Sequence, residues 1–245
     1  MPALPSSVAS DQGFIRHLDS LPLPGASHLS LQRVCFHPAA FTPDCVLAHA
    51  MALPASLQGA APKRLGEFLA GRLAAREALR PFGLAGCTVA IGAAREPIWP
   101  AGFEGSISHS VLAGLGVALC GVRPAEEGMG LDLEAWLGDE QGRQLWPGIM
   151  DEAEWGRLEA GARAAQLSLA EGLTLVFSAK ESLFKALHPR VGRYFDFLDA
   201  RWLGMTEQTL TLELKTALTP ALPAGWRATL HWQPLPGGVL TALLL

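Results

Sequence analysis

Hydrophobic and polar positions repeat along the chain with two different periods. Residues 29–36 alternate at every second position, which is typical of a half-buried strand. Residues 62–80 repeat apolar positions every three to four residues, which predicts a helix that begins at Pro62 and ends before Pro81. The apolar stripe of this helix consists of Leu65, Phe68, Leu69, Leu73 and Leu79.

The rest of the pattern predicts several short strands and one long helical region. Strands are predicted at residues 88–91, 106–108, 111–119, 129–134, 209–214, 228–232 and 239–244, and helix over most of residues 151–187. Neither half alternates strand and helix regularly, as a parallel sheet requires. The pattern therefore predicts an α+β fold of two similarly sized lobes, residues 1–122 and 123–245. The first thirty residues, rich in Pro, Ser and Ala, are predicted to be a loose lead-in.

The composition narrows the class of protein. Of the 245 residues, 49% are hydrophobic and 17% are charged, so the chain can form a sizeable core. The net charge of -4 gives no general attraction to nucleic acid or to an anionic membrane. No secretory signal or membrane-spanning apolar run is found, so a cytoplasmic location is predicted. The four cysteines lack the paired spacing of zinc or disulfide sites, so reduced thiols are expected.

Two carboxylates stand two residues apart in the strand predicted at 129–134. Alternate side chains of a strand share a face, so Asp132 and Glu134 point the same way while Leu131 and Leu133 point to the core. Carboxylates on one face repel each other unless a cation lies between them, and Mg²⁺ prefers such oxygen ligands. The pair therefore indicates either a metal site or an ordinary strand with two solvated acids.

Glu181 has two interpretations within the predicted helical region. With Ser178 it forms an S-x-x-E pattern, in which the glutamate caps the start of a helix. Apolar positions continue on both sides of Ser178, however, which favours one helix with Phe177, Glu181 and Lys185 at successive turns of one face. Glu181 and Lys185 then form either part of a site or a plain surface ion pair.

A second group of candidate residues is basic. His109 is predicted in a turn between two strands, after the hydroxyls of Ser106 and Ser108, where an imidazolium could pair with a phosphate. The alternative is a turn histidine that bonds locally. Beside the apolar stripe of the helix at 62–80 lie four arginines, which form either an anion-facing edge or a solvated face. They are Arg64, Arg72, Arg76 and Arg80.

Several well-known motifs are absent from the sequence. It contains no G-x-x-x-x-G-K-S/T loop, no G-x-G-x-x-G fingerprint, no H-E-x-x-H and no G-x-S-x-G. What remains is a histidine, a pair of carboxylates on a strand, and a carboxylate and an amine on a helix. Such a set suits a metal ion that holds a pyrophosphate beside a base. The sequence therefore points to chemistry at phosphorus.

Five short runs together carry a family resemblance. They are Glu67-Phe68-Leu69-Ala70-Gly71-Arg72, Pro97-Ile98-Trp99-Pro100, Gly105-Ser106-Ile107-Ser108-His109, Gly130-Leu131-Asp132-Leu133-Glu134 and Phe177-Ser178-Ala179-Lys180-Glu181-Ser182. In this order the set resembles the 4′-phosphopantetheinyl transferases of the surfactin-type class, and within it the enterobactin-synthase-type branch. The resemblance covers about residues 63–190.

The resemblance implies a fold, a reaction and partners. It implies a monomer of two pseudo-symmetric α+β lobes with coenzyme A bound between them. A serine hydroxyl of an acyl- or peptidyl-carrier protein attacks the β-phosphorus of coenzyme A, and 3′,5′-ADP leaves. Nucleic acid and membranes are not expected partners. Two alternatives stay open: a metal-dependent phosphohydrolase acting on a nucleotide diphosphate, and a non-catalytic module that binds carrier protein or coenzyme A.

The resemblance also assigns roles to individual residues. Asp132, Glu134 and Glu181 would hold Mg²⁺, and Glu181 would also act as general base. Lys185, catalytic together with Glu181 and Asp132, would neutralise charge on the transferred and leaving groups. The phosphate-binding set would comprise His109 for the 3′-phosphate with Ser108 beside it, Arg64 and Arg72, Lys63 and Arg95, and Lys180, which would contact phosphate or shape the helix.

Overall fold

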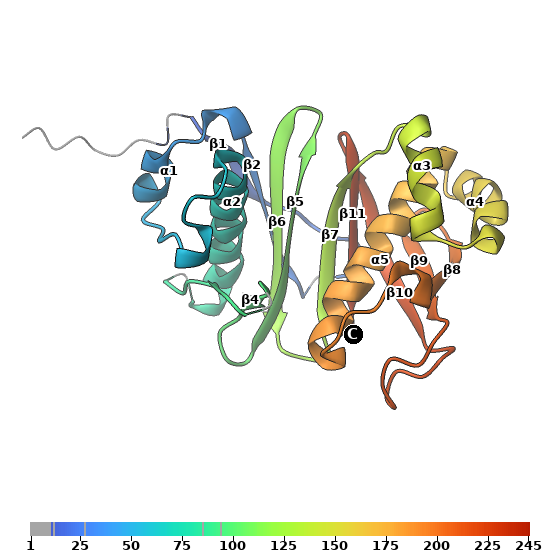
Figure 1. Cartoon of the computed structure of the whole chain (residues 1–245). Coiled ribbons are helices and arrows are strands. Elements are labelled where there is room, and N and C mark those ends of the chain that lie inside the picture. Colours follow the sequence, from blue (N-terminus) through green and yellow to red (C-terminus); the bar gives the residue numbers. More distant parts are fainter. Residues whose placement is uncertain (1–10, 12, 27, 85, 94) are drawn as a thin grey trace, which may run out of the picture.

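The structure, a computed structural model, describes residues 11, 13–26, 28–84, 86–93 and 95–245 (Figure 1). Its strands are β1 (Ile15–Ser20), β2 (Ser30–Phe36), β3 (Ala90–Ile91), β4 (Pro97–Ile98), β5 (Phe103–Leu112), β6 (Leu115–Pro124), β7 (Met129–Ala135), β8 (Ala200–Met205), β9 (Thr209–Leu214), β10 (Arg227–Leu235) and β11 (Gly238–Leu244). Its α-helices are α1 (Pro43–Ala48), α2 (Pro62–Leu79), α3 (Asp139–Ile149), α4 (Glu152–Ala164) and α5 (Leu169–Val191). Short 3₁₀ helices lie at Pro38–Ala40, Ala55–Leu57, Arg80–Phe82 and Phe197–Asp199. The prediction of an α+β fold is confirmed.

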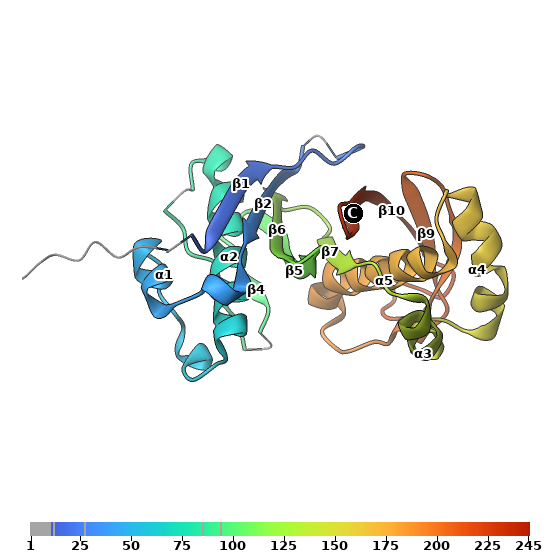
Figure 2. The same ribbon diagram turned by 90° about the horizontal axis from the view of Figure 1, so that it is seen from above.

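Two antiparallel sheets form the framework, each covered by one long helix. The first has the strand order β1-β2-β6-β5 and the second β7-β11-β10-β9-β8. Helix α2 packs on β2 and β6, and α5 packs on β7 and β11. Figure 2 shows the two helix-covered sheets side by side, with the edge strands β5 and β7 where they meet. Each sheet encloses its own apolar core with its helix.

A third apolar core lies where the two sheets meet. Leu131 and Leu133 of β7 are buried in it, together with Leu119 of β6 and Leu240 of β11. Because strand side chains alternate, the neighbouring Asp132 and Glu134 face the other way, toward α5. Strand and helix approach closely here, since a Cβ at Gly130 would collide with the backbone carbonyl of Ser182. The predicted alternation of this strand is confirmed.

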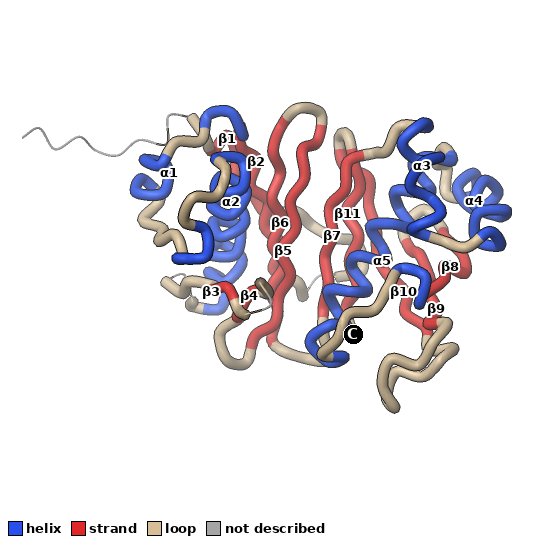
Figure 3. Tube along the Cα trace, viewed as in Figure 1, coloured by secondary structure: helices blue, strands red, loops and turns tan. Residues whose placement is uncertain are grey.

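The sheets join through side chains rather than through a main-chain ladder. β5 and β7 are adjacent edge strands of the two sheets (Figure 3). Ser106 Oγ accepts a hydrogen bond from the amide of Leu131 at 2.9 Å, and Ser108 Oγ accepts one from the amide of Leu133 at 3.2 Å. These hydroxyls take the place of carbonyl acceptors and fix the register between β5 and β7. This pair of serines is called the seam below.

The predicted position of His109 in a turn is wrong. His109 lies inside β5, opposite Ala118 of β6. The turn comes at Ala113 and Gly114, whose φ angles of 48° and 82° are both positive, as in tight hairpins. The strand therefore continues past the histidine, and its side chain belongs to the sheet face that α2 covers.

The predicted lead-in is structured from Ile15 onward. Residues 1–10, 12 and 27 lie outside the described part, but β1 pairs with β2 and Arg33 Nη2 binds Asp19 Oδ2 at 2.6 Å. The main-chain hydrogen bonds between β1 and β2 therefore order a segment whose composition is typical of loops. β6 ends at Pro124 and β7 begins at Met129, so the sheets are connected by residues 125–128. No helix in the described ranges is long and apolar enough to cross a membrane.

Candidate active site

Three of the sequence runs that carry the family resemblance meet at Asp132. It is buried on β7, and Ser108 of β5 donates a hydrogen bond to its Oδ1 at 3.0 Å. Two side chains of α5 complete the set: Lys185 Nζ lies 2.6 Å from Oδ1, and Ser178 Oγ donates to Oδ2 at 2.8 Å. Segments distant in the sequence therefore converge on one carboxylate.

Helix α5 runs unbroken through Ser178, so the interpretation of Ser178 as a helix cap is wrong. The cap is Ser168, whose hydroxyl accepts from the amide of Glu171 at 3.3 Å. Ser178 is instead buried in mid-helix and bonds to Asp132. Lys185 also pairs with Asp132, so the local spacing between Glu181 and Lys185 does not describe its ion pair.

Glu134 and Glu181 stand beside Asp132, and among the described residues only Asp132 of the three forms a salt bridge, with Lys185. The pKa of Glu134 is raised to about 7, mainly by burial; the charges of Asp132 and Glu181 contribute to this rise, and Lys185 opposes it. Burial also raises the pKa of Glu181, with Lys185 lowering it and Asp132 raising it. In the described part of the chain no three such side chains are close enough to hold one ion together. Three mutually repelling carboxylates are nevertheless the donor type that a hard divalent cation takes.

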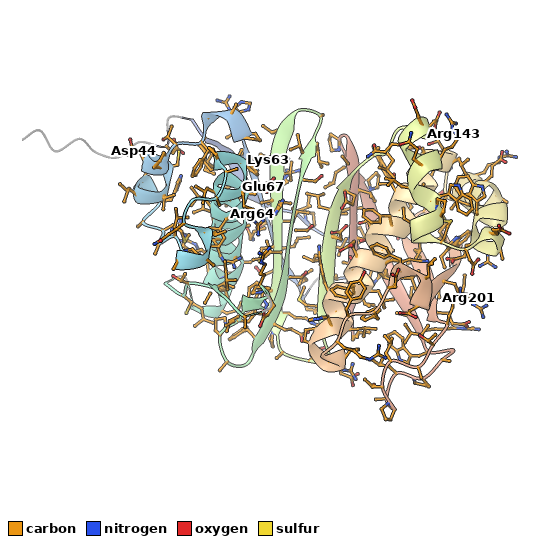
Figure 4. The ribbon with its side chains drawn as sticks, viewed as in Figure 1. Asp44, Lys63, Arg64, Glu67, Arg143 and Arg201 are labelled. Atoms are coloured by element: carbon orange, nitrogen blue, oxygen red, sulfur yellow. The ribbon has the colours of Figure 1, made fainter. Side chains whose placement is uncertain are left out.

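Three basic side chains lie between β5 and α2 and are called the basic wall below. They are His109, Arg64 and Arg72. Arg64 Nη1 is 3.3 Å from His109 Nε2, and Glu67 Oε2 is 3.9 Å from His109 Nδ1. Burial lowers the pKa of His109; Glu67 opposes this, while Arg64 and Lys185 add to it. Figure 4 shows Lys63, Arg64 and Glu67 together on α2. The structure therefore brings His109 and Arg64 together, as an anion site requires.

Arg72 is a buried guanidinium without a charged partner. The residue is only 8% exposed, its Nε has no hydrogen-bond partner, and its Nη2 reaches the carbonyl of Ala90 at 3.4 Å. Its guanidinium lies over the ring of Phe68 at 4.8 Å, and no carboxylate of the described residues pairs with it. Burial lowers the pKa of this group. A buried charge of this kind is costly unless an anion compensates it.

The position of Lys180 favours one of its two predicted roles over the other. The residue is 2% exposed, and its Nζ donates to the carbonyl of Ile149 at 2.8 Å and to Glu154 Oε1 at 3.1 Å. The same Glu154 oxygen accepts from the amide of Trp202 at 2.8 Å. The ion pair thus ties α4, α5 and β8 together. The other predicted role, shaping the helix that carries Glu181, is the one that this position favours.

The remaining basic candidates are exposed or bind other partners. Lys63 is exposed and its Nζ is 3.9 Å from Glu67, while Arg95 is exposed with a φ of 68°. Arg76 donates to the carbonyl of His49, and Arg80 pairs with Glu77. The interpretation of all four helix arginines as one anion-facing edge is therefore wrong for the last two. These two arginines bind a loop carbonyl and a neighbouring glutamate instead of facing a shared anion.

An aromatic cluster that was not predicted from the sequence lies beside Glu181. Phe184 of α5 packs against Tyr194 and Phe195, with ring centroids 5.7 and 5.0 Å apart. Together with Glu181 and Phe197 they line a cavity of about 90 Å³. The dense run from Tyr194 to Phe197 was the signal available in the sequence. The cavity gives the carboxylate an apolar neighbour.

Known proteins match both halves of this site. Over 213 residues the chain is 36% identical to enterobactin synthase component D of Escherichia coli (strain K12), covering 86% of this chain and 90% of the relative. A model of the 4′-phosphopantetheinyl transferase N-terminal domain matches residues 53–121, and one of the 4′-phosphopantetheinyl transferase superfamily matches residues 128–233. The chain belongs to the 4′-phosphopantetheinyl transferase superfamily. The two matched regions of this transferase meet at the connection between β6 and β7.

Further relatives of the transferase come from other bacteria. It is 29% identical over 195 residues to 4′-phosphopantetheinyl transferase PptT of Mycobacterium tuberculosis, covering 75% of this chain and 80% of the relative. It is 36% identical over 143 residues to 4′-phosphopantetheinyl transferase Svp of Streptomyces mobaraensis, covering 58% and 55%. The predicted family and enzyme class are confirmed: the protein is a phosphopantetheinyl transferase, and coenzyme A is its substrate.

Proposed function

We propose that this transferase moves the phosphopantetheine arm onto a serine at the junction of its two lobes, beside Asp132, Glu134, Glu181 and Lys185. The observation that carries the proposal is the meeting of β5, β7 and α5 at the buried carboxylate of Asp132. Phosphoryl transfer depends mainly on positioning and on charge neutralisation. A cluster of acids, an ammonium group and a basic wall supplies the groups for both.

The nucleotide end of coenzyme A belongs on the basic wall. His109, Arg64 and Arg72 would bind its 3′-phosphate, with Lys63 and Arg95 at the rim. Support comes from Arg72, whose buried guanidinium has an unpartnered Nε, and from the 3.3 Å contact between Arg64 and His109. A phosphate there would satisfy charges that the protein leaves unbalanced.

Asp132, Glu134 and Glu181 are the groups that would hold Mg²⁺ by their chemistry, although no three of the described side chains are arranged around one ion. Asp132, Glu134 and Glu181 offer only oxygen donors, which fit this ion by type and by charge. When bound, the ion would neutralise charge on the diphosphate of coenzyme A. The raised pKa of Glu134, about 7, reflects burial and the neighbouring acids, and a cation would relieve the repulsion.

Glu181 would act as general base and Lys185 as the cationic partner of the reaction. The carrier serine hydroxyl gives its proton to Glu181, its oxygen bonds to the β-phosphorus of coenzyme A, and the bond from that phosphorus to 3′,5′-ADP breaks. Burial raises the pKa of Glu181, which makes it a better proton acceptor than an exposed carboxylate. Lys185, held by Asp132 and Ser108, is placed to offset charge on the departing phosphate. The aromatic cavity beside Glu181 suits the apolar part of the arm.

The target would be an apo acyl- or peptidyl-carrier protein. A peptidyl carrier of a siderophore-forming synthetase is the first to test, because one relative is named enterobactin synthase component D. Carriers of fatty-acid and polyketide synthesis are the alternatives. A monomer of two domains, residues 1–122 and 123–245, a cytoplasmic location and no binding of nucleic acid stay predictions.

Mass spectrometry tests the reaction directly. After incubation with coenzyme A and Mg²⁺, each modified carrier is expected to gain the mass of one phosphopantetheine arm, and 3′,5′-ADP is expected in equal amount. A carrier with its target serine replaced by alanine is the control. Release of 3′,5′-ADP without any carrier would favour a phosphohydrolase, and binding of coenzyme A with neither product would favour a non-catalytic module.

Arg72→Gln is expected to remove the preference for coenzyme A over dephospho-coenzyme A, which lacks the 3′-phosphate. A hydrogen bond to a charged group contributes about 1.5–3 kcal/mol, so KM for coenzyme A is expected to rise roughly 10- to 150-fold. KM for dephospho-coenzyme A is expected to change little. Arg76→Gln on the same helix is the matched control, because that side chain binds the carbonyl of His49. An equal loss for both substrates would place the 3′-phosphate elsewhere.

A further inference from the structure

Three buried hydroxyls stand in line behind Asp132, on the side away from the seam. Thr241 of β11 is fully buried and lies opposite Asp132 in the sheet. Its Oγ1 is 2.9 Å from Ser178 Oγ and 2.7 Å from Ser182 Oγ. Ser178 in turn reaches Asp132 Oδ2 at 2.8 Å. None of the motifs that define the site contains Thr241.

The protons in this line have one consistent arrangement. An ionised carboxylate only accepts, so Ser178 donates its single hydroxyl proton to Asp132. Ser178 can then only accept from Thr241, since two lone pairs would otherwise face each other at 2.9 Å. With the Thr241 proton committed, Ser182 donates to Thr241 Oγ1 at 2.7 Å, because two lone pairs would otherwise face each other there as well. Every proton of the chain therefore points toward Asp132.

We propose that Thr241 is a positioning residue of the transferase, which acts on Asp132 through Ser178. A serine inside a helix ordinarily donates to the carbonyl four residues earlier. Thr241 gives the Ser178 oxygen a donor and so keeps its proton on Asp132. Asp132 Oδ2 is thereby fixed, and Oδ1 stays toward Lys185 and Ser108. The inference rests on the proposed function, in which Asp132 is a ligand of the divalent ion.

A matched pair of variants tests this role. Thr241→Val keeps the shape and removes the hydroxyl, whereas Thr241→Ser keeps the hydroxyl. Partners behind a metal ligand typically contribute roughly 10- to 100-fold in metal affinity. We therefore expect Thr241→Val to bind Mn²⁺ at least roughly 10-fold more weakly, measured by electron paramagnetic resonance without coenzyme A or carrier. The kcat of Thr241→Val is expected to fall while its KM for the carrier is unchanged. Thr241→Ser is expected to have the Mn²⁺ affinity and the kcat of the unmodified protein.

The controls separate positioning from stability and from the proposed function. Thr211→Val makes the same change at a surface-exposed hydroxyl of β9 and is expected to leave Mn²⁺ binding unchanged. If Thr241→Val does not fold, Ser178→Ala is expected to show the same loss of Mn²⁺ affinity, and its absence would overturn the proposal. Equal Mn²⁺ affinity in Thr241→Val and the unmodified protein would overturn it too, as would equal defects in Thr241→Val and Thr241→Ser. Failure of the unmodified protein to bind Mn²⁺ would instead count against the metal site.

Discussion

Glu181→Gln is expected to lower kcat by roughly 10²- to 10⁴-fold, the usual contribution of a general base. The amide has the size of the carboxylate but cannot take the proton of the carrier serine. Burial raises the pKa of the native carboxyl group, so the site favours proton uptake and loses it on substitution. The rate of phosphopantetheine transfer measures the effect, and calorimetry is expected to show that coenzyme A still binds.

A control exists on the same helix. Glu171→Gln alters the first turn of α5, where glutamine also satisfies the capping box formed with Ser168, so its rate is expected to be normal. Full activity in Glu181→Gln would remove Glu181 from the role of base. A loss of coenzyme A binding as large as the loss of rate would instead indicate that the side chain orders the site.

Lys180→Met is expected to lower the free energy of unfolding by about 3–5 kcal/mol, because it leaves Glu154 buried without its cation. Both side chains are 1% exposed, so water cannot replace the missing partner. Urea unfolding monitored by tryptophan fluorescence measures the loss. The double substitution Lys180→Met with Glu154→Gln is expected to recover much of it, since the unpaired charge is then removed.

The exposed pair between Lys215 and Asp151 provides the comparison. Its Nζ–Oδ2 distance is 2.8 Å, similar to the buried pair, but both side chains are about one-third exposed. Lys215→Met is therefore expected to cost less than about 1 kcal/mol. If Lys180→Met unfolds like the native protein while KM for coenzyme A rises, Lys180 would contact phosphate after all and the ion pair would not explain its position.

Local periodicity was sufficient for the strand of Asp132 and the helix of Glu181. Leu131 and Leu133 alternate with the two acids, and the apolar positions of α5 continue through Ser178. These patterns depend only on neighbours in the sequence, and the structure keeps them. His109 was misplaced because the glycine that ends its strand lies five residues farther along, where two positive φ angles make the turn.

Partners that are distant in the sequence could not be predicted from the same patterns. Lys185 has a glutamate four residues before it, yet it pairs with Asp132 on another element. Lys180 finds Glu154 on α4, and Ser178 finds Thr241 on β11. No local rule selects such partners, because each depends on how a helix lies across a sheet. Residues behind the site are therefore the ones that structure adds.

The seam between β5 and β7 limits how this enzyme can be recombined with its relatives. Each bond of the seam takes its hydroxyl from the first half and its amide from the second, at Ser106 with Leu131 and at Ser108 with Leu133. A chimera with its crossover between β5 and β7 would keep the apolar core of each half. The two sides of the seam would then come from different proteins. Chimeras built to alter the choice of carrier are therefore better made with crossovers outside residues 103–135, so that both sides of the seam come from the same protein.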